Sequence, residues 1–226
     1  MLFRSVRPTH GVSILAVMVI IFWYRRHLFI PTALYGGAWL LAFVSFSMYH
    51  FGTLLPPYYD VMRLRSETLG VALLGNLISP TRGLFVFVPV TLFVAVALWF
   101  RWRHVRERPL VAVSALAVVV YFVVTSSYPK WWGGWSYGPR LLTGTLPWLV
   151  LLGIHSVESL PTAGALRRAL VSLAAVTATA SILVNALGAF APATWRWNSL
   201  PGAYAQDFYR LWNWRDPQFL RVRDPE

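Results

Sequence analysis

The chain has 226 residues, of which 57% are hydrophobic and 12% are charged, whereas roughly a quarter of the residues of ordinary soluble domains are charged. This composition excludes the soluble globular classes. The net charge of +12 comes almost entirely from arginine. Arginines that flank apolar spans orient membrane helices and contact anionic lipid, so membrane lipids are the expected partners and nucleic acid is not. The absence of cysteine excludes disulfides and thiolate chemistry.

Apolar segments separated by basic or aromatic loops predict an all-α integral membrane protein with about six transmembrane helices. In chain order the spans cover residues 11–24, 28–49, 84–100, 110–127, 141–157 and 169–191. The first segment is short for a span, and no small-residue cleavage site follows it, so it is not a typical secretory signal. Pro147 is expected to kink the fifth span.

The parts between and after these spans are also predicted from composition. The apolar run over residues 69–78 is too short to cross a bilayer and predicts an interfacial or re-entrant helix. Residues 1–191 are therefore expected to form a transmembrane helical domain, and the aromatic, polar residues 192–226 an extracytoplasmic tail.

Three basic clusters in alternate loops indicate the orientation. Arg25–Arg26, Arg101–Arg108 and Arg167–Arg168 can all be cytoplasmic at once, as the excess of Lys and Arg in short cytoplasmic loops requires. A multi-pass protein of a bacterial inner membrane with both termini outside is therefore expected. An outside N-terminus is unusual for a chain that begins with Arg4 and Arg7, and it agrees with a polypeptide that lacks a preceding half.

Two loop segments that each open a span carry a resemblance to a known family. Ile78–Phe85 reads ISPTRGLF and Trp131–Arg140 reads WWGGWSYGPR; Arg210–Pro217 is a third segment near the end. Together they resemble the C-terminal half of bacterial GT-C type membrane glycosyltransferases, similar to the protein O-mannosyltransferase and aminoarabinose-transferase groups. The resemblance covers residues 28–226. It implies a hexosyl transfer reaction that uses a polyprenyl-phosphate-linked sugar at the outer membrane face.

The resemblance also has a departure. The resembling enzymes carry an acidic residue in their first outer loop, and nothing in this chain matches it. The chain is therefore expected to be a truncated module that is inactive alone, with a membrane partner that supplies the N-terminal half. The sugar and its acceptor stay open.

The residue types of the two loops suit a lipid phosphate. Arg82 and Arg140 stand at the outer start of a span, where a guanidinium can engage two phosphate oxygens beside the N–H groups of a helix start. The proposed substrate-binding set adds the aromatic and glycine residues of the second loop, namely Trp132, Gly133, Gly134, Trp135 and Tyr137. The alternative interpretation is an interfacial aromatic belt with Arg140 as an anchor.

Asp60 and Glu67 are the acids in the predicted outer loops between spans. They are candidates for a catalytic base, or for coordinating a divalent cation. A turn residue at Asp60 and an ion pair of Glu67 with a neighbouring arginine are the alternatives. No other cofactor is predicted, and the spacing of the histidines predicts no metal site.

A non-catalytic membrane scaffold or lipid-binding protein is the alternative function. A transporter is disfavoured because the spans contain almost no ionisable groups. Arg82 and Arg140 lining one polar cavity would favour the transferase, and separate insertion of the two arginines among headgroups would favour the scaffold.

Overall fold

The computed structural model describes residues 10–56, 68–199 and 208–221. Within these ranges the regular elements are helices, and no strand is present. In chain order they are α1 (His10–Tyr24), α2 (Arg26–Phe51), α3 (Leu69–Ile78), α4 (Leu84–Phe87), α5 (Val90–Arg101), η4 (Trp102–His104), α6 (Arg108–Ser126), η5 (Arg140–Thr145), α7 (Leu146–Glu158), α8 (Ala165–Phe190), α9 (Pro192–Arg196), η7 (Phe208–Trp212) and η8 (Gln218–Leu220).

Four helical segments of the described chain are long and apolar enough to cross a membrane. They cover Arg26–Phe51, Arg108–Ser126, Arg140–Glu158 and Ala165–Phe190. The chain is therefore a helical, membrane-associated protein, as its composition predicts. The other two expected spans correspond to α1, with 15 residues, and α5, with 12 residues, and both are shorter than this criterion requires.

The predicted continuous span over residues 84–100 is interrupted. α4 ends at Phe87, and Val88 has φ −131° and ψ 61°, which is not helical. Pro89 explains the break, because a proline pushes the preceding residue out of the α region and has no N–H to donate. The predicted kink at Pro147 is not observed, because no continuous helix passes through this residue. Pro147 lies in the first turn of α7, which follows directly on the 3-10 helix η5, and a first turn accepts proline readily.

The bundle core lies between α5, α6, α7 and α8. Phe93 and Ala97 of α5, Val111 of α6, Leu152 of α7 and Leu170 of α8 are buried together there. Many other large apolar side chains of these helices are exposed at the outer surface of the bundle. Such a surface suits a hydrocarbon environment rather than water.

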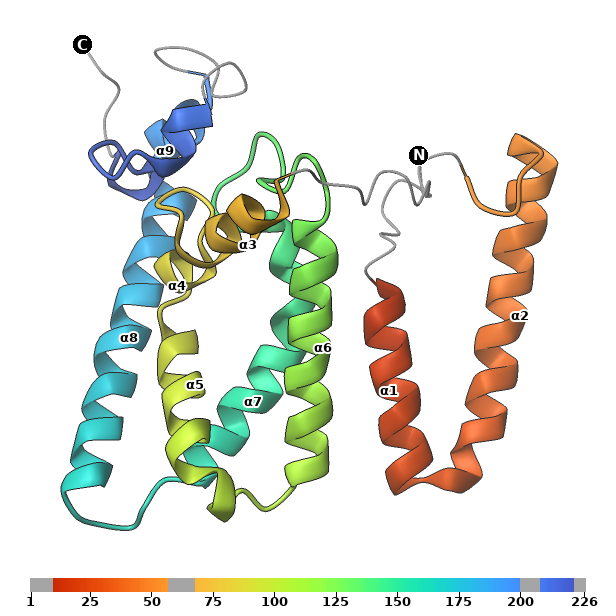
Figure 1. Cartoon of the computed structure of the whole chain (residues 1–226), viewed down its shortest axis with the longest axis horizontal. Helices are drawn as coiled ribbons and strands as arrows, with labels where there is room; N and C mark the ends of the chain where they lie inside the picture. Colours follow the sequence, from red (N-terminus) through yellow and green to blue (C-terminus); the bar gives the residue numbers. More distant parts are fainter. Residues whose placement is uncertain (1–9, 57–67, 200–207, 222–226) are drawn as a thin grey trace.

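α1 and α2 form a hairpin beside this bundle (Figure 1). Ala16 of α1 packs against Ala117 of α6 and Trp148 of α7, and the indole Nε1 of Trp148 donates to Ser13 Oγ at 3.0 Å. α2 contacts α1, and Ser47 is the one buried residue of its length. α1 is thus the element that joins the hairpin to the core.

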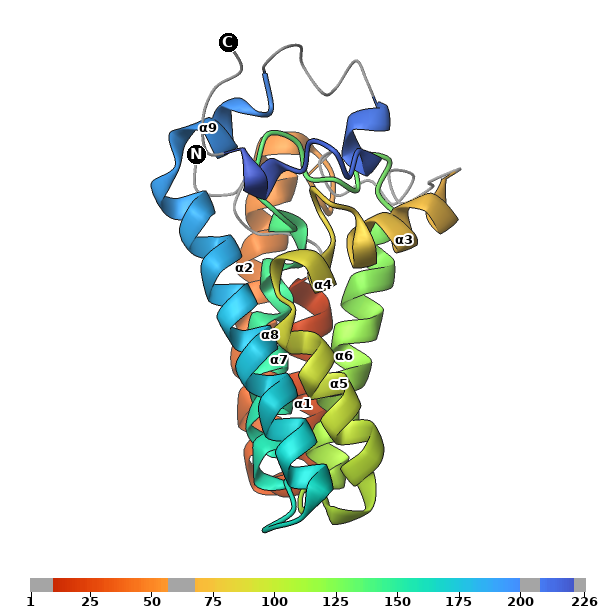
Figure 2. The ribbon, with the colours of Figure 1, turned by 90° about the vertical axis from the view of Figure 1, so that its left-hand side faces the viewer.

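The two ends of the bundle differ (Figures 1 and 2). α3, α9, η7 and η8 lie at one end with the loop between α6 and η5. The connections α1–α2, α5–α6 and α7–α8 lie at the other end. We call residues 68–83, 128–139, 192–199 and 208–221 the cap.

Candidate functional site

Arg82 is the centre of the cap. Its side chain is 1% exposed and lies in the turn between α3 and α4. Gly83 completes this turn, and a Cβ there would stand 2.7 Å from backbone atoms of Ile78 and Ser79. The turn therefore requires glycine after the arginine, which accounts for the Arg–Gly pair in the sequence.

Within the described residues, the guanidinium of Arg82 donates to five acceptors. Nε donates to Trp132 O at 2.8 Å, and Nη1 donates to Thr81 O at 2.7 Å and Gln218 Oε1 at 2.6 Å. Nη2 donates to Gly134 O at 3.3 Å and Asn198 Oδ1 at 3.1 Å. These acceptors match the five N–H groups of an arginine. A buried cation needs such bonding to offset its lost hydration.

Gln218 is a second connecting residue. Its Nε2 donates to Ser136 O at 3.0 Å and to Thr194 O at 2.9 Å, while its Oε1 accepts from Arg82. The side chain is fully buried. One amide thereby joins the turn after α3, the loop before η5, and α9.

The C-terminal segment, by which we mean residues 192–199 and 208–221, makes further contacts with the same turn. Ser79 Oγ donates to Leu211 O at 2.6 Å, and Thr81 Oγ1 donates to the same oxygen at 3.2 Å. Leu211 is buried with Trp131, Trp132 and other apolar residues of the cap. The described part of the predicted tail is thus an integral layer of the cap.

Trp197 anchors the end of this segment. Its buried indole Nε1 donates to Asp216 O at 3.0 Å and lies 3.2 Å from Asp216 Oδ2. The guanidinium of Arg210 lies 4.3 Å from the ring centroid, and Arg221 pairs with Asp216 at 2.8 Å. Cation–π and charge-assisted contacts of this kind stabilise a partly exposed cluster.

The loop between α6 and η5, which we call the Trp–Gly loop (residues 131–139), places its aromatic residues differently. Trp131 and Trp132 are buried with their rings edge to face, whereas Trp135 is 50% exposed. Gly133 and Gly134 adopt positive φ values of 77° and 71°. Glycine is the residue that takes this conformation without strain.

Tyr137 ties the end of the loop to the bundle. Its hydroxyl donates to Val184 O of α8, and its ring packs edge to face on Phe87. Burial raises the pKa of the Tyr137 phenol, although a backbone hydrogen bond at Gly188 opposes this shift. The phenol is therefore a neutral hydrogen-bond donor at ordinary pH.

The two predicted phosphate-binding arginines have different surroundings. Arg82 is buried and bonded to cap acceptors, whereas Arg140 is exposed and begins η5. The two arginines therefore neither line one polar cavity, which would favour the transferase, nor both extend outward among headgroups, which would favour the scaffold. The structure does bring the turn of Arg82 and the Trp–Gly loop into direct contact.

Asp60 and Glu67 lie outside the described residues. Among the residues that the structure describes, no group of three or more His, Cys, Asp or Glu side chains could hold a metal ion. The hydrogen bonds around Arg82 and Gln218 also involve residues that the sequence does not predict as site residues, namely Gln218 itself, Asn198 and Thr194. The aromatic density of the C-terminal segment is the signal that could have indicated its folding.

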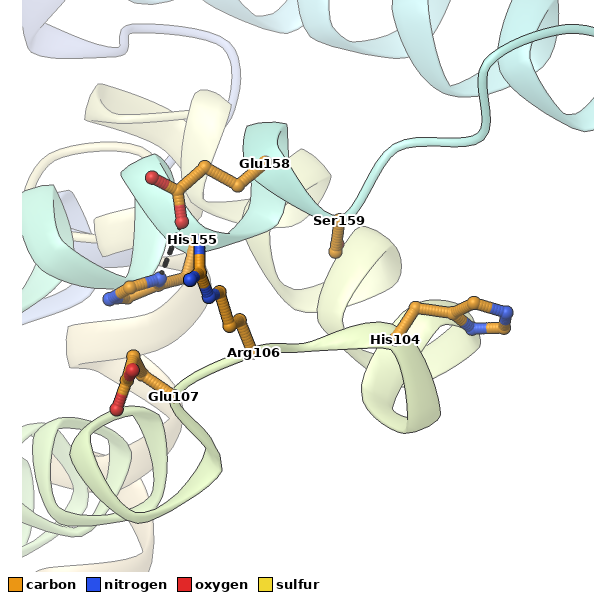
Figure 3. Close-up of a pocket in the computed structure, with 6 residues that line it drawn as sticks. All are labelled: His104, Arg106, Glu107, His155, Glu158 and Ser159. Atoms are coloured by element: carbon orange, nitrogen blue, oxygen red, sulfur yellow. Dashed lines mark hydrogen bonds and ion pairs between the residues drawn. The ribbon is translucent and has the colours of Figure 1, made fainter.

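A pocket of about 690 Å³ lies at the opposite end of the bundle (Figure 3). It is lined by His104, Arg106, Glu107, His155, Glu158 and Ser159. His155 Nδ1 lies 2.9 Å from Glu158 Oε2, and Tyr24 donates to Glu107 Oε2 at 2.8 Å. His104 points away from the other side chains in Figure 3. The acids are thus engaged with protein groups, and the pocket mixes both signs of charge.

The fold and the cap define a class: a helical, membrane-associated protein with a hydrogen-bonded polar cap at one end of its bundle. No protein-family model matches the chain, and no curated protein or solved structure matches it significantly.

Proposed function

We propose that the chain is a GT-C-like membrane glycosyltransferase module that binds a polyprenyl-phosphate-linked sugar at the outer membrane face. The observation that carries the proposal is the contact between the two signature segments, residues 78–85 and 131–140, which carry the resemblance to the family. Arg82 of the ISPTRGLF segment donates to Trp132 and Gly134 of the Trp–Gly loop, which lie about fifty residues further along the chain. Residues of one site must lie close together in space, and the contact between these two segments meets that condition.

Arg140 is the proposed phosphate contact. It is exposed at the start of η5, which continues into the span Arg140–Glu158. A guanidinium at such a position can engage two oxygens of a lipid phosphate. Trp135, half exposed in the Trp–Gly loop that precedes Arg140, offers an aromatic face to the sugar or the lipid.

The proposed module has six spans in a bacterial inner membrane and an outward-facing cap, and a membrane partner supplies an N-terminal half. Asp60 and Glu67 are the module's candidates for the base that activates an acceptor hydroxyl or for a divalent-cation contact.

Photo-crosslinking tests the lipid-phosphate site. The chain in phosphatidylcholine nanodiscs is exposed to a radiolabelled polyprenyl phosphate that carries a diazirine. Arg140→Ala is expected to lower crosslinking by about tenfold or more, because a hydrogen bond to a charged group contributes about 1.5–3 kcal/mol. Arg140→Lys is expected to keep part of it, since the charge remains.

Arg215→Ala is the matched control, because Arg215 is an exposed arginine of the cap, at the same end of the bundle as Arg140. Equal crosslinking of the wild type, Arg140→Ala and Arg215→Ala would contradict the proposed site. In a system that contains the partner half, Arg140→Ala is also expected to abolish labelling of an acceptor from a lipid-linked sugar.

A non-catalytic scaffold or lipid-binding protein is the second candidate. α2 favours it, because this helix of 26 residues is apolar and buries only Ser47 against the rest of the chain. A helix with so much uncovered surface is suited to packing against another membrane protein as well as against lipid. Specific recovery of a membrane partner without any lipid-phosphate crosslinking would favour this function.

A further inference from the structure

The Trp–Gly loop is held by alternate carbonyl groups. Trp132 O and Gly134 O accept from Arg82, and Ser136 O accepts from Gln218. The positive φ values of Gly133 and Gly134 let the backbone turn these carbonyls toward the same pair of buried side chains. The path of the loop is therefore set by Arg82 and Gln218 together.

The next residues carry this constraint toward Arg140. Gly138 has φ 62°, and a Cβ there would stand 2.7 Å from the ring of Phe87. The hydroxyl of the preceding residue, Tyr137, donates to Val184 O of α8. These contacts restrict the backbone between Ser136 and Arg140, and they therefore restrict the position of the first residue of η5.

The C-terminal segment supplies two side-chain acceptors of Arg82 among the residues that the structure describes. Asn198 follows α9, and Gln218 begins η8. Both are fully buried. Asn198 is itself held by its Nδ2, which donates to Trp195 O at 2.9 Å. The C-terminal acceptors therefore help to hold the same guanidinium that binds the loop carbonyls.

We propose that Arg82 is a positioning residue, which, with Gln218 and Asn198 of the C-terminal segment, fixes the Trp–Gly loop and so places Arg140 for a lipid phosphate. The inference rests on the proposed function, and it changes the role of Arg82 from a phosphate contact to a positioning residue. Arg82 acts through the loop, and the C-terminal segment is part of the phosphate site. A direct role of Arg82 would instead require its N–H groups to leave Trp132, Gly134 and Gln218.

Gln218→Ala separates the two roles, because it removes no charge and no proposed phosphate contact. Positioning predicts faster amide hydrogen exchange over residues 131–139 and a loss of polyprenyl-phosphate crosslinking of about tenfold, comparable to that of Arg140→Ala. Asn198→Ala is expected to act in the same direction. Arg82→Lys is expected to behave like Gln218→Ala, because a lysine keeps the charge but not the fork of donors.

Leu220→Ala is the matched control, since Leu220 belongs to the same short helix as Gln218 and is exposed. It is expected to leave both readouts unchanged. Unchanged exchange in α6 shows that each variant retains the bundle. Should Gln218→Ala unfold the bundle, Asn198→Ala in the same two assays decides the matter.

The outcomes separate the two proposals. If Arg140→Ala loses crosslinking while Gln218→Ala and Asn198→Ala leave crosslinking and loop exchange unchanged, the positioning role is overturned and the lipid-phosphate site stands. If these two variants accelerate loop exchange but even the wild type crosslinks no polyprenyl phosphate, Arg82 organises the cap as stated and the proposed function fails. Retained crosslinking in Arg82→Lys with normal loop exchange would support direct contact instead.

Discussion

At the scale of single residues, the cap depends on close approaches that permit no added atom. Gly75 of α3 is buried beneath Trp131, and a Cβ at this position would stand 2.1 Å from the indole ring. Trp131 packs edge to face on Trp132, and its Nε1 has no hydrogen-bond partner within the described residues. Packing alone therefore holds this ring against α3.

Gly75→Ala is expected to destabilise the cap by about 1–3 kcal/mol, the usual cost of overpacking a tight contact. Gly70→Ala in the same helix is the control, because nothing lies within 4 Å of a Cβ there. Alanine at position 70 should be neutral or stabilising, since glycine disfavours a helix. Denaturant titration in detergent, followed by tryptophan fluorescence, measures both. Equal stability of the two variants would show that Trp131 is free to move.

The sequence predicts part of the cap at this scale. The glycines and arginines of the two signature segments indicate tight turns and an anion, and the turn of Arg82 does require Gly83. What the sequence does not indicate is the direction of Arg82. A buried arginine and an exposed one look alike in a pattern, and the acceptors Asn198 and Gln218 lie 116 and 136 residues away. Only the folded chain brings these residues together.

At the scale of elements, side chains of α8 form hydrogen bonds with backbone groups at the break between α4 and α5. Asn185 Nδ2 donates to Phe87 O at 2.8 Å, and the Val90 N–H donates to Ser181 Oγ at 3.0 Å. A break of this kind frees backbone groups, and in a bilayer they must find partners within the protein. The polar residues Ser181 and Asn185 of α8 are thus explained by the break at Pro89.

Asn185→Leu is expected to lower the free energy of unfolding by about 0.5–2 kcal/mol, in the range of interhelical hydrogen bonds in membranes. The variant leaves Phe87 O without the amide while adding an apolar side chain that lipid accepts. Thr179→Val, an exposed position on the same helix, is the control and is expected to be neutral. SDS titration of the protein in mixed micelles measures the difference. A neutral Asn185→Leu would mean that another group serves the carbonyl.

The elements also show what apolar patterning can predict. α3 covers Leu69–Ile78, the same ten residues as the predicted short helix, and α6 and α8 overlap their predicted spans closely. Long apolar runs fix such helices because the backbone must bond internally in lipid. The apolar pattern does not predict the break at Pro89, because an apolar run indicates a continuous helix and the side chains that bind the freed backbone groups stand on α8.

At the scale of the whole molecule, the two ends differ in structure and in how densely their connections carry arginine. The end opposite the cap holds short connections that are dense in arginine, namely Arg25, Arg26, Arg101, Arg103, Arg106, Arg108, Arg167 and Arg168. The cap also contains Arg82, Arg196, Arg210, Arg215 and Arg221, so what distinguishes the two ends is the density of arginine in the short connections. Dense arginine in short loops keeps them in the cytoplasm. This difference favours an outward-facing cap.

Cysteine labelling tests the orientation, because the chain contains no cysteine and gives no background. Lys130→Cys places a thiol at an exposed position of the cap, and Thr162→Cys places one at an exposed position of the α7–α8 connection. A membrane-impermeant maleimide is expected to label Lys130→Cys in intact cells and Thr162→Cys only after permeabilisation. The native chain, carried through the same steps, controls for labelling of other groups.

The reverse pattern would have a direct consequence for the proposed function. Labelling of Thr162→Cys alone in intact cells would place the cap, and Arg140 with it, at the inner face. A sugar linked to polyprenyl phosphate on the outer leaflet could not reach that arginine, since a phosphate does not cross the hydrocarbon core unaided. The topology measurement therefore precedes the crosslinking experiments, because it decides on which side of the membrane the lipid phosphate must be offered.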